Sequence, residues 1–349
     1  MKKIVVSIFL LLFLCVANAY ATYTFVVPQK PGAGTTVWTE LIVSELQKYL
    51  DEKIIIKMIP GARDIPGFNK FHNELQYNDK TVMVSHGGNG VSFLQEEVDY
   101  DYRDYESIGL MNLNIIAGKR KGDIMERPVF AAGSGMVPEA FAMTLLICGP
   151  DKDMQEYIDC FKDKVTWVES MTGSERRLAF KRGELNGTRE NPVAYKKHVS
   201  TNADAEIWFH HGILNPTTGK HLDDPNYPGF QLEILFEQKW GVTPKGEFYD
   251  AYVLVKSFRD GLQKAIWIKK DSPHKKKLIF ALTNMINNKE SMKKLIDKTG
   301  NYEWYVGYKG DQMRDTLLTF VTKPALQNLV RFNTEALGLK SIYKSNLVK

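Results

Sequence analysis

The sequence predicts an α/β protein built from two lobes. Two successive sets of short apolar runs alternate with helical patterns, as expected for strands whose two faces are both covered by helices. Turns rich in glycine and proline separate these runs. The 349 residues, 44% apolar and 25% charged, are enough for two globular lobes of ordinary size.

The first set of elements lies in the N-terminal third of the chain. We expect strands at residues 23–27, 54–59 and 81–85. We expect helices over residues 36–50, 65–75 and 90–96, each after a turn. Near-continuous apolar strands of this kind favour a parallel sheet.

The second set follows the same order. Strands are expected at 129–132, 165–168 and 205–209, and helices over 137–148 and 174–182. Residues 210–229, rich in Gly, Pro, Asn and Asp, predict a loop. The chain should end with helices over 231–240 and 248–259, a strand at 263–268, a helix from His274, and one long helix over 311–337 with a bend at Pro324.

Residues 1–21 are typical of a cleaved export signal. Lys2 and Lys3 precede an apolar stretch over 4–16, and Ala19 and Ala21 offer small residues before a cleavage site. The stretch is shorter than the roughly 20 residues that span a bilayer, so an uncleaved anchor is the weaker alternative. We therefore expect the mature chain to be soluble and to act outside the cytoplasm.

Charge and motifs exclude several classes of protein. Without Lys2 and Lys3, 44 basic residues face 41 acidic ones, a bias too weak to favour nucleic acid. The histidines and aspartates between residues 210 and 224 fit no zinc spacing, and no phosphate-binding or dinucleotide-binding glycine motif occurs. We expect no metal and no cofactor.

Two cysteines remain after the expected cleavage. Cys148 and Cys160 lie 12 residues apart, each near the end of a helical pattern. A disulfide suits an oxidising compartment, and a pair of buried thiols is the alternative.

The turn after the first strand predicts an anion site. A glycine-rich turn that enters a helix collects unpaired N–H groups and the positive end of the helix dipole. An ordinary strand-to-helix connection is the alternative. The candidate ligand contacts in this turn are Gly32, Ala33, Gly34, Thr35 and Thr36.

Three further loops should face the same cleft, because ligands of α/β sheets bind at the carboxyl ends of strands. A structural role for His86 and a plain helix cap at Thr172 are the alternatives. The candidate contacts in these loops are Ser85, His86, Asn89, Gly133, Ser134, Gly135 and Thr172.

Several short motifs follow one another along nearly the whole mature chain. They are the first turn, Pro60-Gly61-Ala62 with Gly67, the stretch YDYRDYESI at 100–108, Ala132-Gly133-Ser134-Gly135, and AFKRGELNG at 179–187. No single motif is specific, but their shared order resembles that of the substrate-binding proteins of tripartite tricarboxylate transporters, the Bug-type receptors.

This resemblance implies a Venus-flytrap receptor of the type II-like periplasmic-binding-protein architecture, and no enzyme. Lobe I would comprise 22–116 plus 268–349, and lobe II 117–267. The receptor would be a periplasmic monomer that holds a small organic anion, a carboxylate, and delivers it to the membrane permease subunits. Thr36 stands where relatives usually have Asp, and Arg63 and Asp64 replace two glycines.

Two other functions fit the same fold. One is a sensory or protein-interaction module, favoured by the altered first and second turns. The other is a secreted α/β hydrolase, for which the chain shows no paired nucleophile and base. Gly133-Ser134-Gly135 lacks the G-x-S-x-G spacing of a nucleophile elbow.

Overall fold

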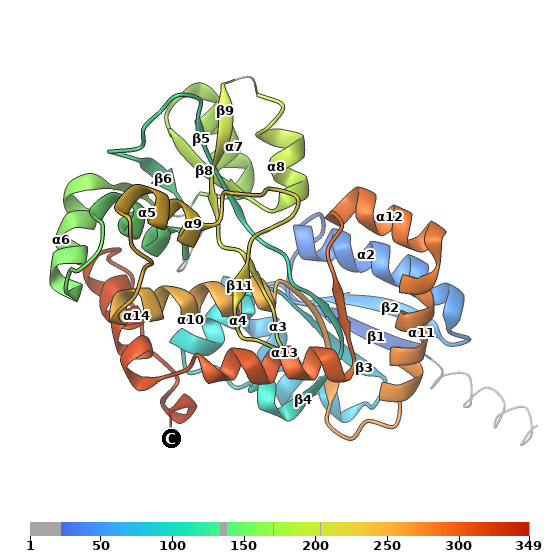
Figure 1. Cartoon of the computed structure of the whole chain (residues 1–349). Helices are drawn as coiled ribbons and strands as arrows, with labels where there is room; N and C mark the ends of the chain where they lie inside the picture. Colours follow the sequence, from blue (N-terminus) through green and yellow to red (C-terminus); the bar gives the residue numbers. More distant parts are fainter. Residues whose placement is uncertain (1–21, 133–137, 170, 203, 349) are drawn as a thin grey trace, which may run out of the picture.

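Two β-sheets define the architecture. The computed structural model describes residues 22–132, 138–169, 171–202 and 204–348. A six-stranded sheet has the order β13-β4-β12-β3-β1-β2, and a five-stranded sheet has the order β7-β6-β8-β5-β9. Figure 1 shows each sheet with its own helices, so the predicted two-lobed α/β class is confirmed.

The first sheet is mixed. Its parallel part pairs β1 (Thr22–Val27) with β2 (Lys53–Met58) and β3 (Thr81–Ser85), as the apolar runs predict. β12 (Lys264–Lys269) then runs antiparallel between β3 and β4 (Tyr105–Met111). The edge strand β13 (Trp304–Val306) is antiparallel to β4. The parallel expectation therefore holds for three strands, and the late strands enter in the opposite direction.

Alternation along β1 explains the two helical layers. Phe25 and Val27 pack in a core with Trp38, whereas Val26 packs on the opposite face in a core with Phe68 and Phe93. The first face is covered by α2 (Gly34–Leu46), α11 (Lys275–Asn287) and α12 (Lys289–Thr299). The second is covered by α3 (Ile65–Asn73), α4 (Gly87–Gln95) and α13 (Tyr308–Thr319).

The second sheet includes elements that the sequence did not reveal. β5 and β8, with α6 and α8, add to the expected strands and helices. The strands are β5 (Ile116–Arg120), β6 (Val129–Ala131), β7 (Thr166–Val168), β8 (Gly187–Glu190) and β9 (Ala205–His210). The helices are α5 (Pro138–Cys148), α6 (Met154–Lys164), α7 (Gly173–Arg182), α8 (Pro192–His198) and α9 (Leu232–Trp240).

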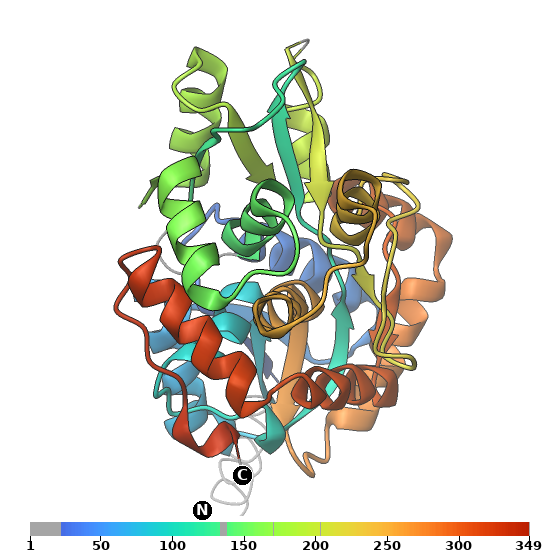
Figure 2. The same cartoon turned by 60° about the vertical axis from the view of Figure 1, so that its left-hand side comes forward.

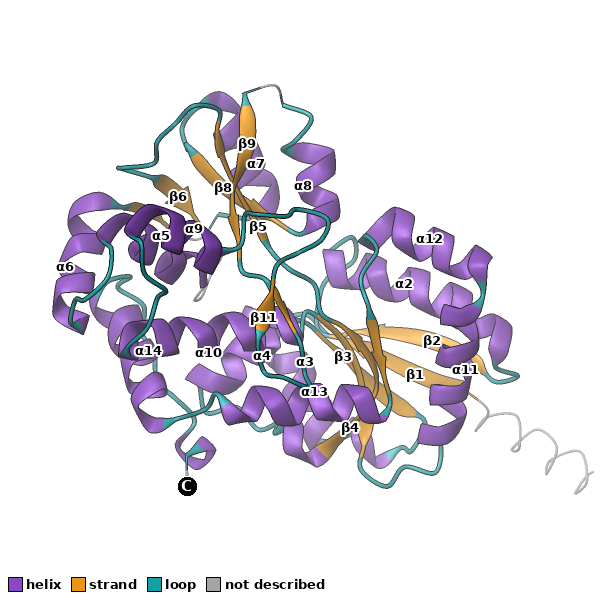
Figure 3. Cartoon of the chain, in the orientation of Figure 1, coloured by secondary structure: helices purple, strands orange, loops and turns teal. Residues whose placement is uncertain are grey.

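The expected loop at 210–229 is long and mostly irregular, as Figure 3 shows. It carries a short ribbon of β10 (Ile213–Leu214) and β11 (His221–Leu222). The described residues also include the 3-10 turns η1 (Gln47–Tyr49), η2 (Ala62–Asp64), η3 (Leu75–Tyr77), η4 (Tyr102–Asp104) and η5 (Ser345–Leu347).

The expected single helix over 311–337 is wrong. The chain instead forms α13 and α14 (Lys323–Glu335), with a break between them. Thr322 accepts a hydrogen bond from the Ala325 N–H and so begins a new helix, and Pro324 occupies its first turn. A proline is tolerated in a first turn because no N–H is needed there.

The helix α10 (Glu247–Gly261) joins the two lobes. It packs against α4 of the first lobe, α5 of the second, and α14. One apolar core accordingly includes residues from both lobes, among them Phe93, Phe141 and Phe258. Figure 2 shows α10, in gold, seen nearly end-on at the centre of the molecule.

The chain passes between the two sheets close to the predicted lobe boundaries, but not at them. β5 begins at Ile116 in the second sheet, and β12 returns to the first sheet at Lys264. The division into 22–116 plus 268–349 and 117–267 stays a prediction.

Cys148, the last residue of α5, forms a disulfide with Cys160 of α6, their Cα atoms 6.2 Å apart. No helix in the described ranges combines the length and apolar character needed to cross a membrane.

Candidate functional site

The carboxyl ends of β1, β2 and β3 gather three helix N-termini at one edge of the first sheet. A cavity of about 450 Å³ lies at this edge, and residues of the second lobe complete its wall. Loops of the first lobe contribute Gln29, Gly34, Thr35, Gly61, Arg63, Asp64, His86 and Gly88. Helix α4 contributes Val91, Ser92 and Gln95, the second lobe Arg189 and Asn191, and the α10–β12 junction Arg259, Gln263 and Lys264.

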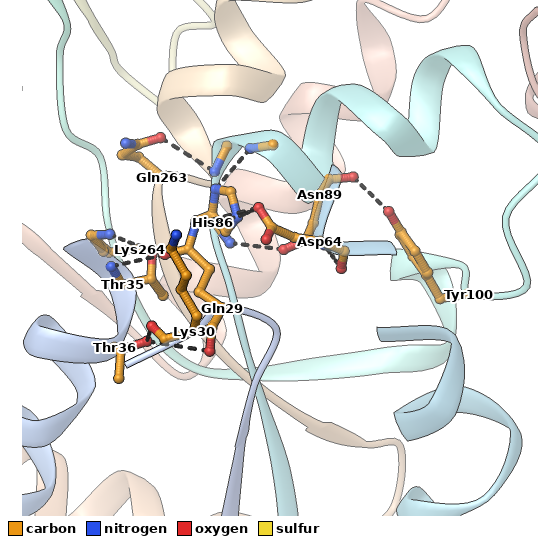
Figure 4. Close-up of polar contacts among 12 residues, drawn as sticks. Gln29, Lys30, Thr35, Thr36, Asp64, His86, Asn89, Tyr100, Gln263 and Lys264 are labelled. Carbon is orange, nitrogen blue, oxygen red and sulfur yellow. Dashed lines mark hydrogen bonds and ion pairs between the residues drawn. The ribbon is translucent and has the colours of Figure 1, made fainter. Parts of the chain in front are cut away.

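His86 and Asp64 form the polar centre of this cavity (Figure 4). The Gly88 N–H donates to His86 Nδ1 at 3.0 Å, so the ring proton sits on Nε2 and is donated to Asp64 Oδ2 at 2.5 Å. Gln29 Nε2 donates to the same carboxylate oxygen at 3.3 Å. Burial lowers the pKa of His86, which outweighs the opposing effect of the Asp64 carboxylate. The pair is therefore a neutral imidazole bonded to an aspartate.

The first turn is held together by its own polar groups. The Thr35 N–H donates to Gln29 Oε1 at 3.1 Å, and Thr36 Oγ1 donates to the Lys30 carbonyl at 2.9 Å. Thr36 is fully buried and closes the turn, whereas Gly34 and Thr35 reach the cavity. Lys264 Nζ donates to Thr35 Oγ1 at 2.8 Å and brings a cation to the start of α2.

The start of α4 is occupied by protein groups. The Gly87 N–H donates to Gln263 Oε1 at 3.2 Å, and the Gly88 N–H is taken by His86. Asn89 accepts from the His86 N–H at 3.3 Å and donates to the Asp64 carbonyl at 2.9 Å. The N–H groups of Gly87 and Gly88 at this helix start are therefore already used by protein groups, and these bonds help to fix His86 and Asp64 in place.

Basic side chains make the cavity electropositive. Arg63 pairs with Glu96, and Arg189 Nη1 donates to Glu139 Oε1 at 3.4 Å. Arg259 and Lys264 differ, because neither forms an ion pair with an acidic residue in the described ranges. Arg259 Nε also has no hydrogen-bond partner there.

The two unpaired cations are buried, and burial is costly for a charge. Burial lowers the pKa of Arg259 to about 10. Burial, followed by the nearby Arg259 guanidinium, lowers the pKa of Lys264 to about 7. The Lys264 residue is only 9% exposed. Glu139, Asp260 and Asp64 attract Arg259, and Asp64 attracts Lys264, but none of them forms an ion pair with either side chain in the described ranges. A bound anion would supply a direct counter-charge for both.

The candidate residues from the sequence fall into three groups. Gly34, Thr35 and His86 line the cavity, whereas Gly32, Ala33, Thr36, Ser85, Asn89 and Thr172 do not. Gly133, Ser134 and Gly135 lie outside the described residues. Ligand contact by any of these residues stays a prediction.

Two of the candidate residues that do not line the cavity have structural roles, as their hydrogen bonds show. Ser85 is fully buried and accepts a hydrogen bond from Trp267 Nε1 at 2.7 Å. Thr172 caps α7, where its hydroxyl accepts from the Glu175 N–H at 3.4 Å. The described ranges contain no cluster of three or more His, Cys, Asp and Glu side chains placed to hold a metal ion.

Sequence reasoning missed the part of the cavity that comes from distant segments. Arg189 lies in β8, a strand without an apolar run, and Asn191 directly follows it. Arg259, Gln263 and Lys264 lie where α10 ends and β12 begins. Their one local signal is a run of polar residues between an apolar helix and an apolar strand.

Comparison of the sequence with protein families and with curated proteins gives no match. The fold, however, is similar to solved structures. A TctC solute-binding protein from Polaromonas aligns with TM-score 0.54 and 13% identity over 88% of this chain and 98% of that one. The periplasmic binding protein BugD aligns with TM-score 0.54 and 11% identity over 90% and 97%.

MatC from Rhodopseudomonas palustris, solved with bound malate, aligns with TM-score 0.51 and 16% identity over 90% of this chain and 98% of that one. A second R. palustris protein, solved with adipate, gives 0.52 and 12% over 90% and 97%. The chain therefore has the two-lobed fold of these binding proteins, and the resemblance drawn from its motifs is confirmed at the level of the fold.

Proposed function

We propose that this protein is a solute-binding receptor that captures a small organic anion in the cavity between its lobes. The observation that carries the proposal is the pair Arg259 and Lys264, two buried basic side chains that line the cavity and form no ion pair with an acidic residue in the described ranges. Lys264 contacts Thr35 at the start of α2, and Arg259 lies near the end of α10. Buried charges are normally paired, so this arrangement favours an anionic ligand. Malate and adipate, bound by two proteins of the same fold, belong to that chemical class.

We place the receptor in the periplasm, as a monomer that passes its ligand to permease subunits of the tripartite tricarboxylate type. Residues 1–21 support export, because they combine a basic start, an apolar stretch and small residues before a cleavage site. The fold supports the transport role, since BugD and MatC are similar over nearly their whole length.

The chemistry of the cavity supports binding over catalysis. His86 is the one histidine among the described residues that line the cavity. Both of its ring nitrogens are engaged, Nδ1 by the Gly88 N–H and Nε2 by Asp64. A general base needs a free nitrogen within reach of the proton that it removes. This arrangement therefore does not favour the hydrolase alternative.

The test is ligand binding with a matched pair of variants. Calorimetric titration of a panel of organic acids should give saturable binding to the wild type. Arg259→Met should weaken binding at least tenfold, because a hydrogen bond to a charged group is worth about 1.5–3 kcal/mol. Lys276→Met, an exposed residue of α11, is the control and should bind like the wild type.

Arg259→Met should not lower the melting temperature of the ligand-free protein, because removing an unpaired buried charge is neutral or stabilising. Absence of binding by every acid in the panel, together with absence of a retained ligand in native mass spectrometry, would refute the proposed function.

A further inference from the structure

The lining of the cavity is unusually polar. Apart from three glycines, Val91 is the single apolar residue among the described residues that line it. Small-molecule sites are generally lined mostly by apolar and aromatic side chains, with a few polar groups. A ligand with a long hydrocarbon chain or an aromatic ring would therefore find little matching surface here.

Four amide side chains and two hydroxyls stand in that lining. The amides belong to Gln29, Gln95, Asn191 and Gln263, and the hydroxyls to Thr35 and Ser92. Amides and hydroxyls both donate and accept hydrogen bonds. This combination matches ligand hydroxyl groups, which also do both, better than it matches carboxylates, which only accept.

Asp64 adds an acceptor that a plain dicarboxylate cannot use. Its Oδ2 accepts from His86 and Gln29, and no side chain in the described ranges donates to Oδ1. A ligand carboxylate facing Asp64 would meet a like charge, whereas a hydroxyl would donate to it. A ligand ammonium would suit Asp64 but would be repelled by Arg259 and Lys264.

On the basis of the proposed function, we infer that the ligand is a polyhydroxylated carboxylic acid, that is, a sugar acid. Its carboxylate meets Arg259 and Lys264, and its hydroxyls meet Asp64 and the amides. The cavity of about 450 Å³ falls within the usual size range of small-molecule sites.

Calorimetric titration of the purified full chain with five probes tests the ligand class. The probes are D-galacturonate, D-gluconate, malate, adipate and neutral D-galactose. At least one of the two sugar acids should bind at least tenfold more tightly than malate, adipate and galactose.

If malate or adipate binds more tightly than both sugar acids, the inference is overturned. The proposed function is then still supported, because an organic anion binds. Galactose binding as tightly as galacturonate would overturn the role of the two cations. Binding of none of the four acids would overturn this inference, and together with the absence of a retained ligand in native mass spectrometry it would count against the proposed function itself.

Asp64→Asn tests the residue that carries the inference. Asn is isosteric with Asp and tolerates the left-handed backbone of this position, where φ is 62°. The variant should lose at least tenfold in affinity for the bound sugar acid while its affinity for adipate, which has no hydroxyl group, is unchanged or higher. Asp151→Asn, in an exposed turn with φ of 56°, is the matched control and should change neither affinity.

The ratio of the two affinities separates this role from a structural one. A general disturbance of the cavity would weaken both ligands alike, and that outcome would overturn the inference. Unchanged sugar-acid affinity in Asp64→Asn would overturn it as well.

Discussion

Lys264 is the residue whose charge state links the cavity to pH. It is almost fully buried, its ammonium group donates to the Thr35 hydroxyl, and burial lowers its pKa to about 7. The side chain is therefore cationic below about pH 7 and neutral above it in the ligand-free protein. An anion in the cavity would hold the proton on Lys264 more tightly.

We expect the affinity for an organic anion to fall as the pH rises above 7, because binding must then also protonate Lys264. In Lys264→Met this pH dependence should be lost, together with part of the affinity. Calorimetric titrations at pH 6, 7, 8 and 9 on both proteins measure the effect. Equal slopes of affinity against pH in the two proteins would contradict it.

The stability of the ligand-free protein should show the opposite trend. The folded-state pKa of Lys264 lies below its ordinary value of 10.5, so between about pH 7 and 10.5 the unfolded chain binds the extra proton. Stability contributed by this group therefore rises with pH across that window. Urea denaturation at pH 7 and 9.5 should show this rise in the wild type relative to Lys264→Met.

Sequence reasoning could predict the half of the cavity that lies in strand-to-helix turns. Gly34, Thr35 and His86 follow apolar strands, and the carboxyl ends of parallel strands meet at one edge. Arg189 and Arg259 could not be found in this way, because tertiary packing of distant segments brings them to the cavity. Their local sequence is that of an ordinary charged surface.

At the scale of elements, the glycines of α4 serve close packing. A Cβ atom on Gly87 would overlap the Arg259 carbonyl oxygen, and one on Gly90 would lie 2.6 Å from the Phe258 carbonyl oxygen. Glycine thus lets α4 approach the end of α10 and brings Arg259 and Gln263 to the cavity. The glycines at this helix start therefore reflect close contact between two helices.

Gly87→Ala should destabilise the protein by about 1–3 kcal/mol, the usual cost of overpacking, because α4 and α10 must separate. Gly34→Ala is the matched control. A Cβ atom on Gly34 has no neighbour within 4 Å, so the stability of the Gly34→Ala variant should be unchanged or slightly higher. Urea denaturation of both variants measures the difference, and equal stabilities would contradict the packing role.

The disulfide between Cys148 and Cys160 should stabilise the second lobe. It closes a short loop between α5 and α6, for which chain entropy gives about 2–3 kcal/mol. In the double variant Cys148→Ala/Cys160→Ala the free energy of unfolding should fall by that amount, and the urea midpoint should fall with it. Its ligand affinity should be unchanged, because neither residue lines the cavity. A urea midpoint equal to that of the wild type would contradict this stabilisation. So would a reductant that lowers the midpoint of the variant as much as that of the wild type.

Some elements could be predicted from the sequence because their apolar periodicity is strong, as in β1, β3 and α10. β8 could not, because its sequence GTRE contains no apolar side chain and its pairing with β5 decides its conformation. The break between α13 and α14 was missed for a different reason. A proline within a helical pattern can bend one helix or begin another, and here the Thr322 cap decides.

At the scale of the whole molecule, the two lobes share one apolar core. Phe93 of the first lobe, Phe141 of the second and Phe258 of α10 belong to the same cluster. The lobes are therefore not independent folding units joined by a flexible linker, because exposing one would expose part of the other.

Scanning calorimetry should accordingly show a single unfolding transition, with fluorescence and circular dichroism giving the same midpoint. A saturating ligand should raise that one midpoint, since a ligand present at 100 times its Kd adds about 2.7 kcal/mol. Two resolved transitions, or a protease-resistant fragment containing a single lobe, would show that the lobes unfold separately.

The position of β12 in the first sheet also affects the order in which the protein can be made. This strand lies between β3 and β4, yet it is encoded long after both of them. A ribosome adding about 5–20 residues per second needs roughly 10 to 35 s to pass from Ser85 to Lys264. Throughout that interval the first sheet lacks its central strand, so the sheet cannot be completed until the C-terminal part of the chain has been made. If the chain is exported as proposed, we expect this late strand to delay completion of the first lobe and so to favour passage across the membrane in an unfolded state.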